Sequence, residues 1–217
     1  MEPMKTAALL KAGFLAVAVS ISPVQAGIVI SDNLNQPHSA GATLSATTWA
    51  GQAFFSGAYT ALEAVHLNLY GGTAGEFSVQ LWNAEGAGGR PGSVVATVAS
   101  GLSNPTTLDV NNVVSITGLN VPMVKLTTYY IVVRPTSGIV RWGYTDSQSG
   151  VGFPSAFSYT VNAGGSWSDP DYNNPQRMMV EAVPEASTWI AGAFAGMILL
   201  AGVARRKWIA RQADPAN

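Results

Sequence analysis

Cysteine is absent from this chain of 217 residues, and charged side chains are scarce. Without cysteine the protein has no disulfide framework, no thiolate metal site and no cysteine nucleophile. Only 11% of the residues are charged, and the segment 27–182 carries five basic against nine acidic side chains. Because a nucleic-acid-binding protein needs a basic face, this segment does not fit that class of protein.

The segment 27–182 also lacks any amphipathic helical pattern of ten or more residues. Instead, apolar and polar residues alternate, as they do from Val65 to Leu69 and from Phe77 to Leu81. Short β-prone runs separated by Gly and Asn turns recur at residues 27–31, 49–55, 64–70, 77–82, 94–99, 113–116, 121–124, 129–134, 139–144, 153–161 and 177–183. The pattern predicts an all-β domain over 27–182, an antiparallel β-sandwich or jelly roll.

The sequence predicts the form of three connections in this domain. Residues 32–48 are small and polar, which predicts a loop. Residues 71–75 read Gly-Gly-Thr-Ala-Gly and should join the strands on either side as a hairpin. Residues 85–92 are rich in glycine around Pro91 and should form a surface loop in which glycine supplies positive φ.

The N-terminal segment has the pattern of a secretory signal peptide. Lys5 and Lys11 precede an apolar stretch at 12–21, which Pro23 interrupts before small residues lead to Ala26. This order predicts a signal-peptide helix within 1–26, cleaved between Ala26 and Gly27. The protein is therefore expected to be exported.

The C-terminal segment has the pattern of a membrane anchor. From Trp189 to Ala204 there are 16 residues without a charge, which as a helix would span about 24 Å. Trp189 suits one membrane interface, and a basic cluster, formed by Arg205, Arg206 and Lys207, ends the run. We expect a transmembrane helix at 189–204 whose basic end stays in the cytoplasm, which places the β-domain on the periplasmic side of the inner membrane.

The tail 183–211 resembles the PEP-CTERM sorting signal of bacterial exopolysaccharide-associated proteins. The resemblance rests on the order of a short motif, an apolar span and a basic end, with the motif formed by Pro184, Glu185, Ala186, Ser187, Thr188 and Trp189. Ala186 stands where the family usually has a second proline. The resemblance implies that an exosortase, a membrane cysteine protease-transpeptidase, recognises the tail and cleaves near Pro184 and Glu185.

Most of the β-domain, from about residue 49 to 182, resembles the choice-of-anchor R type of exported bacterial domain. The matching parts are the Gly-Arg-Pro-Gly-Ser segment at 89–93 and the strand Thr-Tyr-Tyr-Ile-Val-Val at 128–133. Members of that family occur with different C-terminal anchors. The resemblance implies no established activity.

Catalytic patterns are weak. The two histidines, His38 and His66, are expected on the surface, and no Gly-x-Ser-x-Gly nucleophile motif occurs in the β-domain. A glycosidase needs two paired carboxylates, and no spacing singles out a pair among Glu63, Glu76 and Glu85. We predict no catalytic residue, no cofactor and no enzyme activity; a disguised hydrolase is the rival from another class.

Two binding sites are candidates. Asp169, Asp171 and Asn173 place oxygen ligands at positions 1, 3 and 5 of a turn, a weak candidate calcium site, with Asp146 as a further ligand. Trp82 and Trp167 are the aromatic residues expected to be exposed, where a ring can stack on a sugar.

Together these patterns predict an exported, non-enzymatic protein of the cell surface or extracellular matrix. Its partners are the inner membrane and an exosortase-type processing enzyme, with exopolysaccharide as a further candidate and no nucleic acid. One alternative is a carbohydrate-binding module for exopolysaccharide. The other is an envelope protein that keeps its span as a permanent anchor.

Overall fold

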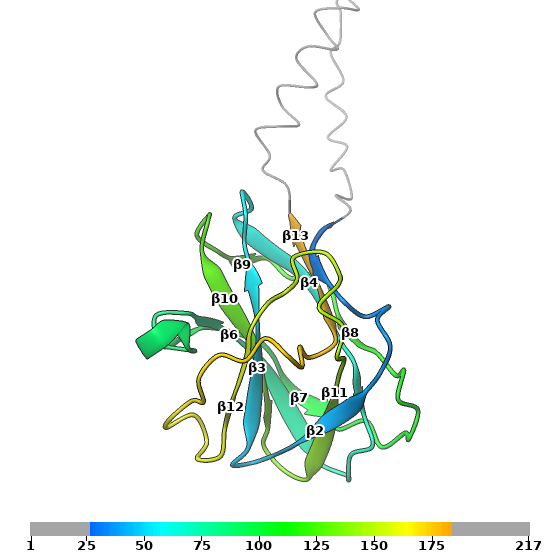
Figure 1. Ribbon diagram of the computed structural model, residues 1–217. Helices are drawn as coiled ribbons and strands as arrows, with labels where there is room; N and C mark the ends of the chain where they lie inside the picture. Colours follow the sequence, from blue (N-terminus) through cyan, green and yellow to red (C-terminus); the bar gives the residue numbers. More distant parts are fainter. Residues whose placement is uncertain (1–26, 184–217) are drawn as a thin grey trace, which may run out of the picture.

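The computed structural model describes residues 27–183, which form an all-β domain (Figure 1). This confirms the predicted all-β class. The strands are β1 (Ile28–Asp32), β2 (Ala40–Ser45), β3 (Trp49–Phe55), β4 (Ala61–Leu67), β5 (Leu69–Tyr70), β6 (Glu76–Asn83), β7 (Val94–Ser103), β8 (Val114–Ile116), β9 (Val121–Pro122), β10 (Thr128–Pro135), β11 (Ile139–Tyr144), β12 (Phe157–Thr160) and β13 (Met178–Val183).

The strands form three antiparallel sheets. The terminal sheet has the order β1-β13-β4-β8, with β9 also paired to β4; the central sheet has the order β12-β3-β10-β6-β7; and the short sheet has the order β2-β11-β5. β12 is an outer strand, as residues 153–161 predict. The predicted surface loop 85–92 joins β6 to β7, which pair antiparallel, and Gly88 and Gly89 in this loop have φ values of 72° and 79°.

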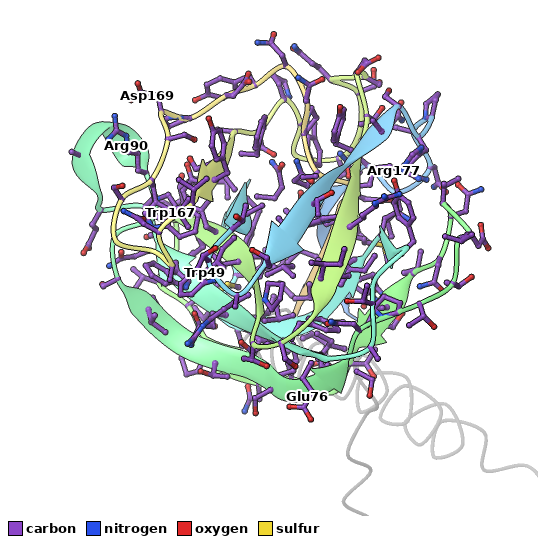
Figure 2. The ribbon with its side chains drawn as sticks, turned by 90° about the horizontal axis from the view of Figure 1, so that it is seen from below. Trp49, Glu76, Arg90, Trp167, Asp169 and Arg177 are labelled. Atoms are coloured by element: carbon purple, nitrogen blue, oxygen red, sulfur yellow. The ribbon has the colours of Figure 1, made fainter. Side chains whose placement is uncertain are left out.

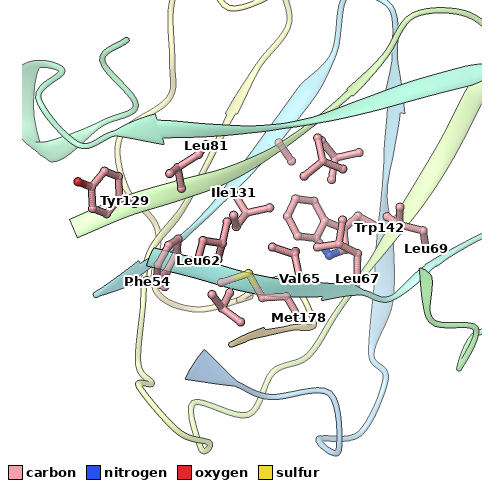
Figure 3. Close-up of a cluster of buried hydrophobic side chains, with 14 of the residues drawn as sticks. Phe54, Leu62, Val65, Leu67, Leu69, Leu81, Tyr129, Ile131, Trp142 and Met178 are labelled. Carbon is pink, nitrogen blue, oxygen red and sulfur yellow. The ribbon is translucent and has the colours of Figure 1, made fainter. Parts of the chain in front are cut away.

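All three sheets contribute to one hydrophobic core (Figure 3). The central sheet supplies Phe54, Leu81 and Ile131, and the terminal sheet faces them with Leu62, Val65 and Met178. The short sheet closes one end with Trp142, whose indole N–H donates to the Arg177 carbonyl at 3.0 Å. Sheets that pack face to face over a shared core are consistent with a β-sandwich.

The predicted hairpin across residues 71–75 is wrong. β4 ends at Leu67, and after the fully buried Asn68 the chain enters the short sheet as β5. β6 lies in the central sheet, so neither β4 nor β5 pairs with it. The glycine segment instead binds other loops, because the Gly71 and Gly72 amides donate to the carbonyls of Thr107 and Pro105. The segment therefore carries the chain from one sheet to another.

The predicted loop 32–48 contains a strand, β2, which pairs with β11 along its whole length. Its residues, Ala-Gly-Ala-Thr-Leu-Ser, show no clear alternation of apolar and polar side chains, so the pairing has no local signal. Gly41 is required by packing, since a Cβ there would lie 2.4 Å from the Tyr70 hydroxyl oxygen.

The two ends of the domain lie side by side (Figure 1). β1 and β13 pair antiparallel, so that Ile28 lies opposite Ala182 and Asp32 opposite Met179. Over residues 27–183 no helix has the length and apolar character that a membrane crossing needs. The predicted signal peptide 1–26 and transmembrane helix 189–204 lie outside the described residues.

Candidate ligand-binding cleft

Three strands of the central sheet, β3, β10 and β6, are buried on both faces. Along β10, Tyr129, Ile131 and Val133 point into the main core, while Tyr130 and Val132 point the other way. There they join a second cluster, the outer cluster, made of Trp49, Ala53, Trp82, Tyr130, Val132, Ala156 and Trp167. The segment 153–172, which includes β12, supplies Ala156 and Trp167 to this cluster.

Trp82 and Trp167 lie in this cluster and not on the surface, which corrects their expected exposure. Each ring is 8% exposed, and the two pack edge to face with centroids 5.5 Å apart. The Trp82 indole N–H also donates to the Gln80 side chain at 3.1 Å. At this exposure neither ring presents a free face on which a sugar could stack.

A buried glutamine holds segment 153–172 against the sheet. The Gln52 amide nitrogen donates to the Ser155 hydroxyl at 2.8 Å and to the carbonyls of Ser155 and Ala156 at 3.1 and 3.0 Å. The oxygen of the Gln52 side chain accepts from the main-chain N–H of Gln176 at 2.7 Å. Because the side chain is fully buried, these bonds fix the segment without competition from water.

A half-open cleft of about 560 Å³ lies where this segment meets the end of the sheet. Its rim carries three exposed apolar side chains: Phe55 at 51%, Leu126 at 73% and Tyr172 at 53% exposure. The polar side chains in the lining are those of Glu85, Thr127, Thr128, Tyr130 and Ser155.

Tyr130 forms part of the cleft wall and links it to the loop 85–92. Its ring is buried, and its hydroxyl donates to the Gly89 carbonyl at 2.9 Å. Burial raises the pKa of the Tyr130 hydroxyl, because the phenolate would be poorly solvated there. The hydroxyl therefore stays neutral at physiological pH, and its bond to Gly89 ties the cleft wall to the loop 85–92.

The candidate calcium ligands serve the loop itself. Asp169 pairs with Arg90 across two neighbouring loops, seen together on one side of Figure 2. The Asp171 carboxylate accepts from the Asn173 amide at 2.8 Å and from its side chain at 2.9 Å, which folds the turn that carries Tyr172. Among the described residues, no three His, Asp or Glu side chains gather into a possible metal site.

The two histidines lie in different places, and neither is a free surface imidazole. The His38 Nε2 lies 2.9 Å from the Tyr70 hydroxyl. His66 lies between two strands, with Nδ1 2.8 Å from the Ser115 hydroxyl and Nε2 3.5 Å from the Glu181 carboxylate.

The Ser115–His66–Glu181 row has the groups of a hydrolase triad, and sequence reasoning missed it because they come from three strands. The Nε2 atom makes no hydrogen bond in this row. The candidate carboxylates Glu63, Glu76 and Glu85 lie on β4, at the start of β6 and in the loop after β6.

A second polar cluster lies around Arg177, on the opposite side of the molecule in Figure 2. Arg177 is 6% exposed, and its guanidinium donates to the Leu34 carbonyl and to the Asn68 side chain, the latter at 3.1 Å. Burial lowers the pKa of Arg177, and burial together with the Arg177 charge lowers the pKa of His38. These bonds join the loops beside β4 and β13, so the cluster stabilises the fold.

The predicted sorting motif and the basic cluster at 205–207 lie outside the described residues, as does Ala26; Gly27 is the first described residue.

The cleft was not predicted, because its lining comes from several separate segments. Comparisons of the chain with protein-family models, with curated proteins and with solved structures give no match.

Proposed function

We propose that this protein is an exported, non-enzymatic protein of the cell surface or extracellular matrix. The observation that carries the proposal is the order of parts: a signal-peptide pattern, a β-domain, a Pro-Glu motif, an apolar span and a basic cluster. The body between the two targeting patterns is all-β, and its ends leave from adjacent strands. Such a body is suited to being carried on a single stalk.

In this proposal the body is a jelly roll, preceded by a signal-peptide helix in 1–26 and followed by a transmembrane helix at 189–204. The inner membrane first holds the protein with its body on the periplasmic side. An exosortase-type enzyme then cuts near Pro184 and Glu185 and releases the body or attaches it to envelope material.

Cell fractionation with mass spectrometry of the mature chain ends tests this proposal. We expect an N-terminus at Gly27 and the loss of all residues beyond about Pro184 and Glu185. Replacing both motif residues with alanine should leave the tail uncut, whereas Gln212→Ala, beyond the basic cluster, should be processed normally. A body that stays in the cytoplasm would refute export.

A permanently anchored envelope protein is the alternative for the tail, and Ala186 is the residue that decides it. The family signal to which the tail is similar usually has proline at this position. If the enzyme requires that proline, the natural chain stays intact in the inner membrane and Ala186→Pro converts it to a processed form. If the natural chain is already cut, the substitution changes little.

A further inference from the structure

We propose that the cleft beside Phe55 and Tyr172 binds a short stretch of neutral polysaccharide. Where the protein is exported as proposed above, the nearest such ligand is the polysaccharide of the producing cell. The cleft itself does not depend on that proposal.

The first support is the placement of exposed rings. Phe55 and Tyr172 each leave about half of their surface open to solvent, and both line the same cleft. Apolar side chains that gather at the surface beside a hollow can mark a ligand-binding site. The flat face of an aromatic ring matches the C–H groups on one face of a sugar ring, and Tyr172 sits at the tip of a turn that presents it outward.

The second support is the set of polar groups around the rings. Glu85 is held by the Asn83 amide, which donates to its Oε2 at 2.7 Å, so the carboxylate is oriented before any ligand arrives. The Ser155 hydroxyl accepts from Gln52 and therefore keeps its own proton for donation. A carboxylate that accepts and hydroxyls that donate or accept are the partners that adjacent sugar hydroxyls require.

The third support is charge. Glu85 is the charged residue in the cleft lining, which contains no Lys or Arg. An anionic ligand such as a phosphate, a sulfated glycan or a uronic acid would meet repulsion from Glu85 and find no cation in the lining. A lipid chain would leave the polar half of the lining unpaired, at a cost in desolvation. A neutral, hydroxyl-rich ligand avoids repulsion from Glu85 and can pair with the polar groups of the lining.

The fourth support is that the walls are fixed. Leu126 has a φ of 54°, which is strained for a leucine, and its amide donates to the Gly57 carbonyl at 2.7 Å. Its neighbour Thr127 is tied through its amide to the Ser56 hydroxyl at 3.0 Å. Strained backbone that the surroundings hold in place is common at ligand clamps. A preformed wall also lowers the entropic cost of binding.

The test is binding of the full-length chain, purified in detergent, to an array of short neutral oligosaccharides of glucose, galactose, mannose and N-acetylglucosamine, with oligogalacturonate as the anionic probe. We expect at least one neutral probe to bind and the anionic probe not to bind. Tyr172→Ala should weaken that binding about tenfold or more, and Glu85→Gln, which keeps the shape, several-fold. The same array carries polysaccharide from the producing cells.

Tyr159→Ala is the matched control, since Tyr159 is 50% exposed and lies outside the cleft lining. It should bind as the natural chain does, and near-ultraviolet circular dichroism should show all three variants folded. Failure of every neutral probe, binding of oligogalacturonate alone, or an equal loss in Tyr159→Ala would overturn the proposal. Binding of a neutral probe without the cell's own polysaccharide would support the cleft and assign its ligand to another source.

Discussion

Strands β3, β10 and β6 of the central sheet are buried on both faces, but different kinds of structure cover the two faces. The inner face packs against two other sheets, and its neighbours are Leu62, Val65 and Met178 on regular strands. The outer face packs against the segment 153–172, most of which is loop around the short strand β12, and Gln52 ties that segment down. A face covered by a loop can hold a cleft beside its core, because loops on a rigid scaffold often carry binding residues.

Replacing a large aromatic residue with alanine should give the biggest difference in stability between the two faces. Phe54→Ala on the inner face removes a ring that is 1% exposed and should lower the free energy of unfolding by about 3–5 kcal/mol. Trp167→Ala on the outer face should cost about 2–3 kcal/mol, because its indole nitrogen has no hydrogen-bond partner and the loop can settle into the space. Urea unfolding measures both values.

Hydrogen exchange supplies the control for this pair. Trp167→Ala should speed amide exchange within 153–172 and leave β6 and β10 protected, whereas Phe54→Ala should speed exchange everywhere through global unfolding. Uniform acceleration in both variants would mean that the loop and the sheets unfold as one unit.

Two neighbouring valines give the same comparison without a change in chemistry. Val132 and Val133 are both fully buried, and they point to opposite faces of β10. Val133→Ala on the inner face should cost about 2–3 kcal/mol and Val132→Ala about 1–2 kcal/mol, since the loop relaxes more easily around a cavity. Thermal unfolding of the two variants side by side measures the difference. Equal costs would show that the loop is packed as rigidly as the sheets.

Tyr130→Phe should make the outer face less sensitive to alkali. Loss of the bond to the Gly89 carbonyl should cost about 1 kcal/mol near neutral pH. Burial raises the pKa of Tyr130 in the folded chain, so its stabilising effect is complete below the unfolded pKa of about 10 and is lost as pH rises through the folded pKa. The free energy of unfolding, measured from pH 8 to 11, should therefore fall less steeply with pH in the variant than in the natural chain.

The smallest effect is expected at the edge of the outer face. Arg90→Ala removes the ion pair with Asp169, whose side chain is 85% exposed. An exposed pair of this kind contributes little, so the change in stability should stay below about 0.5 kcal/mol. Thermal unfolding in low and high salt checks it, and a loss above 1 kcal/mol would show that the pair holds the two loops together.

The sequence predicts individual strands well because their signal is local. Val65, Leu67 and Leu69 alternate with polar residues, and so do Phe77, Val79 and Leu81. The second run lies in β6, whereas the first ends β4 and begins β5. Pairing between strands carries no such local signal. The fully buried Asn68 separates β4 from β5 and redirects the chain, which makes the expected hairpin wrong.

The lack of a local signal for long-range packing also explains why the tryptophans were wrongly expected to be exposed. Ser78, Gln80 and Trp82 alternate with apolar residues, a pattern typical of a strand with one wet face. A segment more than 70 residues away in the chain packs against Trp82 on that face, and all three side chains are buried. The cleft depends on the same long-range packing, and no single stretch of sequence indicates it.

The pairing of β1 with β13 has a mechanical consequence. Because Ile28 lies opposite Ala182, a pull applied to both ends of the domain loads one pair of residues first. The hydrogen bonds of this seam would then open one after another, as a zipper does, and little force would be needed. A pull through the C-terminal end alone loads no such seam, so a body held by one stalk withstands drag that would unzip the same body held at both ends.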